Sequence, residues 1–112
     1  MKILIIRFSS LGDIILTFPV AKNIKLNNEN AEIYYLTKKQ FAGVVKKNRD
    51  ISQVFEFSSL SDSLATLRKH RFDIVIDLHS NIRSFIIMRL LNAGKKLKYA
   101  KDSLYRRLFV NF

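Results

Sequence analysis

The polar residues nearest the N-terminus form one compact group that could do chemistry. Residues 8–13 place two hydroxyls (Ser9 and Ser10), a glycine (Gly12) and a carboxylate (Asp13) at the start of a helical pattern. Gly12 allows close backbone approach or a positive φ, and the free N–H groups at a helix start attract anions. The helix dipole favours the charged form of Asp13, which could accept a proton from an attacking hydroxyl. The alternative is that Asp13 only caps the helix, because Asp is a favoured N-cap residue.

A second polar group follows the apolar run that ends at residue 76. It contains Asp77, His79, Asn81 and Arg83. Asp77 could tie the loop backbone through its oxygens, and a lone loop histidine such as His79 more often makes a hydrogen bond than acts as a base. Arg83 could bind a phosphate or a carboxylate through two parallel hydrogen bonds. With 2 histidines and no cysteine, and no carboxylates at ligand spacing, the sequence predicts no metal site.

Short apolar runs alternate with helical patterns along the chain. Residues 3–6, 33–36 and 74–76 are continuous runs, typical of strands buried on both faces. Residues 54–57 include a glutamate, as a strand nearer an edge would, and residues 97–99 are a weaker fifth candidate. Strand and helix in alternation predict an α/β fold: a Rossmann-like parallel sheet with flanking helices.

The first helix is expected over residues 14–26, interrupted by Pro19. Proline removes a backbone donor and clashes with the preceding turn, so we expect a kink or a restart with Thr17 as the cap. Apolar residues at helical spacing predict four further helices: Phe41, Val44 and Val45; Leu60, Leu64 and Leu67; Phe85, Met88 and Leu91; and Leu104, Tyr105, Leu108 and Phe109.

The expected fold brings the two polar groups together. In an open α/β sheet, ligands bind outside the carboxyl ends of the strands, where the strand order reverses. With the common order 3-2-1-4-5, that crevice lies between strands one and four, beside residues 8–13 and 78–81. Lys38 and Lys39 follow strand two and lie at the same edge. Neither the Gly-x-Gly-x-x-Gly of a dinucleotide site nor the Gly-Lys-Ser/Thr of a P-loop is present.

Composition limits the possible partners. The chain has 112 residues, 48% of them hydrophobic, no cysteine and a net charge of +11. Such a charge attracts nucleic acid, an anionic membrane face or a phosphorylated substrate, although a lysine-rich solvated surface is an equally good explanation. No apolar stretch reaches the roughly 18–20 residues of a membrane-spanning helix, so a cytoplasmic protein is expected. The chain stops soon after a helical pattern, which we interpret as a truncated domain; the alternative is that the last helix is a genuine terminus.

The order of residues resembles one family. Residues 3–20 are similar to the N-terminal signature of glycosyltransferase family 9, the lipopolysaccharide heptosyltransferases, above all in Ser-Leu-Gly-Asp (residues 10–13) followed by Thr-x-Pro (residues 17–19). Residues 36–41 and 72–84 also match, except that the family usually has glycine where this chain has Ser80. The resemblance runs in register over essentially the whole chain.

That resemblance implies a GT-B architecture, in which two Rossmann-like domains face each other across a cleft. Residues 1–112 would be the N-terminal, acceptor-side domain, truncated, and the C-terminal nucleotide-sugar domain would be absent. The family transfers heptose from ADP-heptose to the phosphorylated lipid A–inner core acceptor, with inversion and without a required metal or other cofactor. We therefore expect the isolated chain to be inactive, and the active protein to contact the anionic inner face of the inner membrane peripherally.

The resemblance also implies roles for single residues. Asp13 matches the aspartate proposed as the general base, with or without a capping role. Residues on the acceptor side are assigned by position as Ser9, Ser10, Gly12, Lys38, Lys39, His79, Asn81 and Arg83.

Two rival interpretations remain. A basic α/β module could bind nucleic acid or an anionic membrane without catalysis, but the aromatic residues mostly fall in apolar runs and no basic–aromatic stacking pattern indicates nucleic acid. A decayed remnant with an incomplete sheet would fold poorly, and cooperative unfolding would argue against it.

Overall fold

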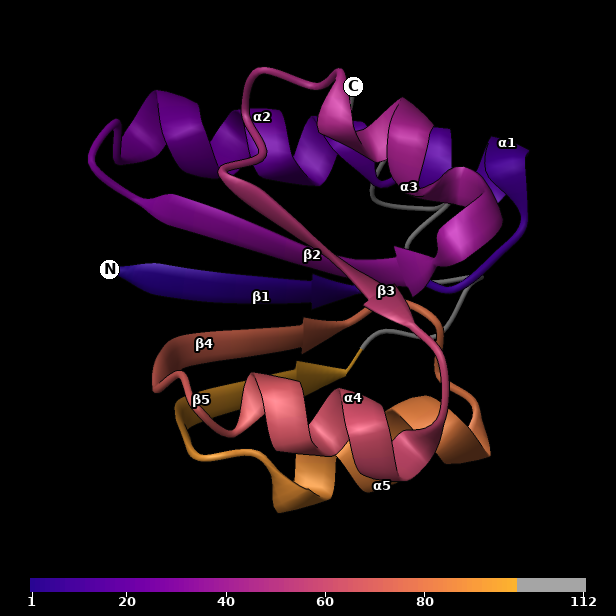
Figure 1. Cartoon of the computed structure of the whole chain (residues 1–112). Coiled ribbons are helices and arrows are strands. Elements are labelled where there is room, and N and C mark those ends of the chain that lie inside the picture. Colours follow the sequence, from indigo (N-terminus) through magenta and orange to yellow (C-terminus); the bar gives the residue numbers. More distant parts are fainter. Residues whose placement is uncertain (99–112) are drawn as a thin grey trace.

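A computed structural model describes residues 1–98 and contains one parallel sheet of five strands (Figure 1). The strand order is β3-β2-β1-β4-β5, as predicted, and every neighbouring pair is parallel. The strands are β1 (Lys2–Ile6), β2 (Glu32–Lys38), β3 (Gln53–Phe57), β4 (Phe72–Asp77) and β5 (Ala93–Lys98). The Rossmann-like fold class is confirmed.

Five helices connect the strands and cover both faces of the sheet. They are α1 (Leu11–Ile15), α2 (Phe18–Asn27), α3 (Lys39–Lys46), α4 (Leu60–Leu67) and α5 (Ile82–Leu90). Helices α1, α2 and α3 lie on one face, above the sheet in Figure 1, and α4 and α5 lie on the other. None of the helices in the described part of the chain is long and apolar enough to cross a membrane.

The central strand β1 is buried on both faces, which explains its continuous apolar run. Leu4 and Ile6 belong to the core beneath α4 and α5, whereas Ile3 and Ile5 belong to the core beneath α1 to α3. All four side chains are at most 3% exposed. Successive side chains of a strand point to opposite faces, so each helical layer receives alternate residues of β1.

The two edge strands, β3 and β5, carry exposed charged side chains that the central strand lacks. Glu56 of β3 is exposed and its carboxylate lies 3.5 Å from Nζ of Lys46. Strand β5 begins at Ala93, four residues before the predicted start, because its exposed lysines conceal the apolar alternation. Charged side chains on an edge strand discourage pairing with other sheets. Tyr99 and the helix predicted around residues 104–109 lie outside the described residues.

Two helix predictions need correction. The first helix begins at Leu11 rather than Ile14, so Gly12 and Asp13 lie inside its first turn. In α5, Met88 and Leu91 are buried as expected, but Phe85 of the same predicted stripe is 43% exposed.

The restart predicted at Pro19 is confirmed. Helix α1 ends at Ile15, α2 begins at Phe18, and Thr17 holds the cap position. The Thr17 side chain does not cap the new helix. Its hydroxyl donates to the carbonyl of Ile14 (2.6 Å) and therefore accepts from the hydroxyl of Tyr35 (2.6 Å). Both residues are fully buried, so the bond anchors the helix break to β2.

We expect the Thr17–Tyr35 hydrogen bond to contribute measurably to stability. Replacing Tyr35 with Phe removes both the donor and its need for a partner, and should cost about 1 kcal/mol in urea unfolding. Thr17→Val leaves the buried Tyr35 hydroxyl without an acceptor and should cost about 2 kcal/mol. The double variant should cost no more than Thr17→Val alone. Strictly additive losses would contradict the coupling.

Candidate functional site

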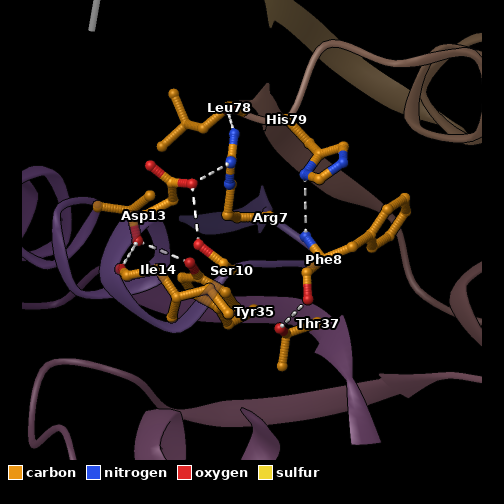
Figure 2. A network of polar contacts seen from close by, with 10 residues as sticks. Arg7, Phe8, Ser10, Asp13, Ile14, Tyr35, Thr37, Leu78 and His79 are labelled. Carbon is orange, nitrogen blue, oxygen red and sulfur yellow. Dashed lines mark hydrogen bonds and ion pairs between the residues drawn. The ribbon is translucent and has the colours of Figure 1, made fainter. Parts of the chain in front are cut away.

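The loops after β1 and β4 meet at the carboxyl edge of the sheet. Ile6 pairs with Asp77, and the N–H of Leu78 donates to the carbonyl of Ile6 over 3.0 Å. The residues that follow each strand are therefore neighbours, although they are about seventy positions apart in sequence. Figure 2 shows the polar contacts that join the two loops.

A buried arginine connects the two loops. Arg7 follows β1 directly and is 7% exposed. Its Nη1 donates to the carbonyl of Leu78 (3.1 Å), and its Nη2 lies 2.9 Å from Oδ2 of Asp13 (Figure 2). A guanidinium this deeply buried requires an anionic partner, and Asp13 supplies it. The sequence interpretation assigned no role to Arg7.

Asp13 lies at the rim of this junction and is not the helix cap. It is the third residue of α1, behind Ser10 at the N-cap, so the interpretation of Asp13 as a capping residue is wrong. The hydroxyl of Ser10 donates to the same Oδ2 that contacts Arg7, over 3.1 Å. The Asp13 side chain keeps 16% of its surface exposed. Two contacts thus orient a carboxylate that solvent still reaches.

Gly12 precedes Asp13 and is exposed. Of the two alternatives for Gly12, the positive φ is wrong, since the described residues include no glycine with positive φ; close approach by another molecule stays a prediction. A Cβ built at Gly12 would meet no atom within 4 Å beyond its chain neighbours and the backbone of its own helix. Nothing in the described chain therefore requires glycine at this position.

Asp77 organises the second loop from within, as the sequence suggested. It is fully buried. Its Oδ1 accepts the N–H groups of His79 and Ser80, and its Oδ2 accepts the hydroxyl of Ser84, each over 2.9 Å. Ser80 has φ of 57°, the left-handed region that glycine adopts without strain. The glycine usual in the resembled family fits that backbone better than serine does.

His79 connects the second loop to the first. Its Nδ1 accepts the N–H of Phe8 over 3.3 Å, and its ring lies 5.0 Å from the Phe8 ring. Burial lowers the pKa of His79 below its ordinary 6.5; Arg7 and Lys38 lower it further, whereas Asp77 and Asp13 oppose the decrease. An Nδ1 that accepts a hydrogen bond carries no proton, so the neutral ring bears its proton on Nε2. The hydrogen-bonding interpretation of His79 is confirmed.

Two other predicted site residues are engaged elsewhere. Asn81 caps α5: its side chain accepts the N–H of Ser84 while the hydroxyl of Ser84 accepts the N–H of Asn81. Arg83 is exposed and its guanidinium lies 5.9 Å from the centre of the Phe57 ring, at the end of β3. The roles of both residues toward an acceptor remain predictions.

The lysines after β2 lie on the same edge. Lys38 ends β2 and its N–H donates to the carbonyl of Phe8 over 3.3 Å. The hydroxyl of Thr37 donates to that carbonyl too, over 3.2 Å (Figure 2). Lys39 begins α3 and is exposed, whereas Ser9 is half-buried in the first loop.

The structure thus assembles a rigid, oriented carboxylate with positive charge around it. Ser10, Asp13, His79 and Lys38 come together at the junction of β1, β2 and β4. An oriented carboxylate can accept a proton from a bound hydroxyl. Within residues 1–98, no three carboxylate or imidazole side chains gather in a way that could hold a metal ion.

Comparison with known proteins gives relatives of one kind. No protein-family profile matches the chain. Lipopolysaccharide heptosyltransferase 1 of Campylobacter coli is 32% identical in an alignment of 119 residues. The alignment covers 100% of this chain and 34% of that protein. Lipopolysaccharide heptosyltransferase 3 of Escherichia coli is 26% identical, over 89% of this chain and 34% of that protein. The chain therefore spans about a third of the length of the curated relatives it matches.

Solved structures share the fold. A glycosyltransferase family 9 protein from Veillonella parvula matches with a TM-score of 0.78 and 24% identity, over 94% of this chain and 33% of that one. E. coli heptosyltransferase WaaC, solved with ADP, matches with a TM-score of 0.75 and 21% identity, over 85% of this chain and 35% of that one. WaaC was also solved with ADP-2-deoxy-2-fluoro heptose. The resemblance to family 9 heptosyltransferases is confirmed.

The lowered pKa of His79 predicts a pH dependence of stability. The folded state prefers neutral His79 more than the unfolded state does, so its contribution is complete above about pH 6.5 and is lost as the pH falls below that value. Urea unfolding between about pH 8 and pH 5 should show this decline. In His79→Asn, an amide oxygen can still accept the Phe8 N–H but does not titrate, so the decline should be smaller. An unchanged decline would show that another group causes it.

The Arg7–Asp13 pair should behave as one unit. Arg7→Met removes the charge beside a mostly buried carboxylate and the donor to Leu78, and should lower the free energy of unfolding by about 2 kcal/mol. The double variant Arg7→Met/Asp13→Asn should recover about 1 kcal/mol relative to the sum of the single losses. Urea unfolding at matched m values tests this. Independent losses would mean that the two side chains do not stabilise each other.

Proposed function

We propose that this chain is the acceptor-side part of a lipopolysaccharide heptosyltransferase, with Asp13 as the general base. The observation that carries the proposal is the Asp13 carboxylate, oriented by Arg7 and Ser10 at the carboxyl edge of β1 and β4 and still 16% exposed. Similarity to two curated heptosyltransferases supports the reaction class. The shared fold of solved family 9 structures is consistent with a GT-B architecture.

The proposed reaction is a direct displacement. An acceptor hydroxyl attacks the anomeric carbon of the donor heptose and forms the new C–O bond, while the bond to the ADP phosphate oxygen breaks on the opposite face. Asp13 takes the hydroxyl proton as the attack proceeds, which makes the oxygen a better nucleophile. Attack from the face opposite ADP inverts the anomeric configuration.

The donor is proposed to bind outside residues 1–112. WaaC was solved with ADP and with an ADP-heptose analogue, and two-thirds of the curated relatives' length has no counterpart in this chain. We infer that a second, nucleotide-sugar-binding domain holds ADP-heptose and stabilises the charge of the leaving ADP. Residues 1–112 alone should then give negligible turnover, because a general base contributes only about 10²–10⁴-fold.

The acceptor is proposed to be the phosphorylated lipid A–inner core. Lys38 lies within electrostatic reach of His79, and Lys39 follows it at the same edge. Together with the net charge of +11, these cations would attract an anionic lipid at the cytoplasmic face of the inner membrane. Ser9, Ser10, Gly12, His79, Asn81 and Arg83 remain the other proposed acceptor-side residues. A binding module without catalysis would not need the oriented carboxylate.

The base assignment predicts the effect of Asp13→Asn. Transfer from ADP-heptose to a phosphorylated inner-core acceptor would be measured with this chain joined to the remaining part of the Campylobacter coli relative. Loss of the base should lower kcat by about 10²–10⁴-fold with a small change in KM, because Asn cannot accept the proton.

Asp62→Asn provides a matched control. Asp62 is the third residue of α4 behind the N-cap Ser59, just as Asp13 is the third residue of α1 behind Ser10. It therefore has the same helix position and charge but lies after β3, away from the loops that follow β1 and β4. Activity of Asp62→Asn should equal that of the parent protein. Full activity of Asp13→Asn, with Asp62→Asn unchanged, would rule out Asp13 as the base.

A further inference from the structure

Helix α5 exposes apolar side chains that the described residues, 1–98, leave uncovered. Ile82 is 76% exposed, Phe85 43% and Leu90 47%. With 3.6 residues per turn, these three side chains and Arg89 point to the side opposite Ser84, Ile87, Met88 and Leu91, which face the sheet and are buried. A surface helix normally turns polar residues outward, so three large apolar side chains on the outer side of α5 indicate an interaction surface.

The charges around these apolar residues have one sign. The guanidinium of Arg89 lies 6.0 Å and Nζ of Lys98 lies 5.6 Å from the centre of the Phe85 ring. Nζ of Lys96 donates to the carbonyl of Arg89 over 3.2 Å, so it lies beside the same helix. The sequence contains no aspartate or glutamate from residue 78 to residue 101. The surface is therefore apolar at its centre and cationic at its margin.

This surface adjoins the candidate site. Helix α5 begins immediately after the loop that Asp77 organises, so Ile82 lies at the carboxyl edge of the sheet. Lys98 ends β5 at that same edge, because β4 and β5 are parallel and Lys98 pairs with Asp77. A ligand anchored on this surface would lie beside the edge that carries Asp13.

We propose that the α5 surface, formed by Ile82, Phe85, Arg89, Leu90 and Lys98, docks onto a bilayer that contains anionic lipids. Charge complementarity favours this partner. The cations would bind the anionic headgroups, and the apolar side chains would enter the boundary between headgroups and acyl chains. A phosphate backbone would satisfy the cations but not Ile82 or Leu90, which makes nucleic acid the weaker partner. Docking would hold the candidate site beside a membrane that carries its lipid acceptor. That purpose rests on the proposed function, whereas binding to the membrane does not.

Cosedimentation with lipid vesicles tests the proposal. The chain would be mixed with vesicles of phosphatidylcholine alone or with phosphatidylglycerol, and binding should require the anionic lipid. Neutralising Arg89 and Lys98 together (Arg89→Gln/Lys98→Gln) should weaken binding about fivefold for each charge. Ile82→Asn should weaken it about tenfold, because an inserted aliphatic group is lost.

The opposite face of the sheet offers matched controls. Leu26 of α2 is 72% exposed, almost the same as Ile82, so Leu26→Asn removes an equally exposed aliphatic group. Lys22→Gln/Lys47→Gln removes two exposed charges from α2 and the end of α3. If the α5 surface docks, both control variants should bind vesicles within about twofold of the parent chain, a change equivalent to less than RT. Thermal unfolding would verify that every variant remains folded.

Three results would overturn the proposal. The parent chain could fail to bind anionic vesicles, the two charge pairs could weaken binding equally, or the chain could bind unrelated DNA as tightly in a way that Ile82→Asn does not alter. Asp13→Asn should bind vesicles as the parent chain does, since Asp13 is not part of the α5 surface. Membrane docking and the proposed transfer reaction can therefore fail separately.

Discussion

A buried guanidinium needs an anionic partner, and in this chain that requirement organises the carboxyl edge of the sheet. Arg7 leaves the central strand with 7% of its surface exposed, so its charge must be compensated nearby. The compensation comes from Asp13 in the first loop and from the carbonyl of Leu78 in the loop after β4. One side chain thus holds the carboxylate in place and joins the loop after β1 to the loop after β4.

The polar residues of the edge differ in whether the fold engages all of their polar atoms or leaves one available. Asp77 spends both oxygens on the loop backbone and on Ser84, and is fully buried. His79 uses Nδ1 to hold Phe8, which leaves a protonated Nε2 as the remaining ring donor. Such double use restricts rotamers before any ligand arrives, and a pre-oriented group loses less freedom on binding.

The architecture was largely predictable because it depends on local patterns. Continuous apolar runs identify β1, β2 and β4, and Pro19 identifies the break between α1 and α2. What could not be predicted depends on distant contacts. The role of Arg7 requires Leu78, 71 positions away, and α1 begins early because Ser10 and Arg7 hold Asp13 in the first turn. The start of β5 was concealed because Lys95 and Lys96 lie on an exposed edge. The role of Asp13 as a base was inferred from the resemblance to a family. The residue types and their spacing alone did not distinguish that role from helix capping.

Gly12 carries an implication for how this sequence is maintained. Glycine in the middle of a helix costs roughly 0.5–1 kcal/mol relative to alanine; Gly12 lies in the first turn, where a methyl group would meet no atom beyond its chain neighbours and its own helix backbone. Foldability alone would therefore let mutation replace Gly12 with alanine, and stability would rise. If Gly12 is nevertheless retained, the selection must come from a ligand or partner that approaches the α1 backbone closely. Mutational tolerance at Gly12 therefore separates a lineage still under functional selection from one retained only as a folded relic.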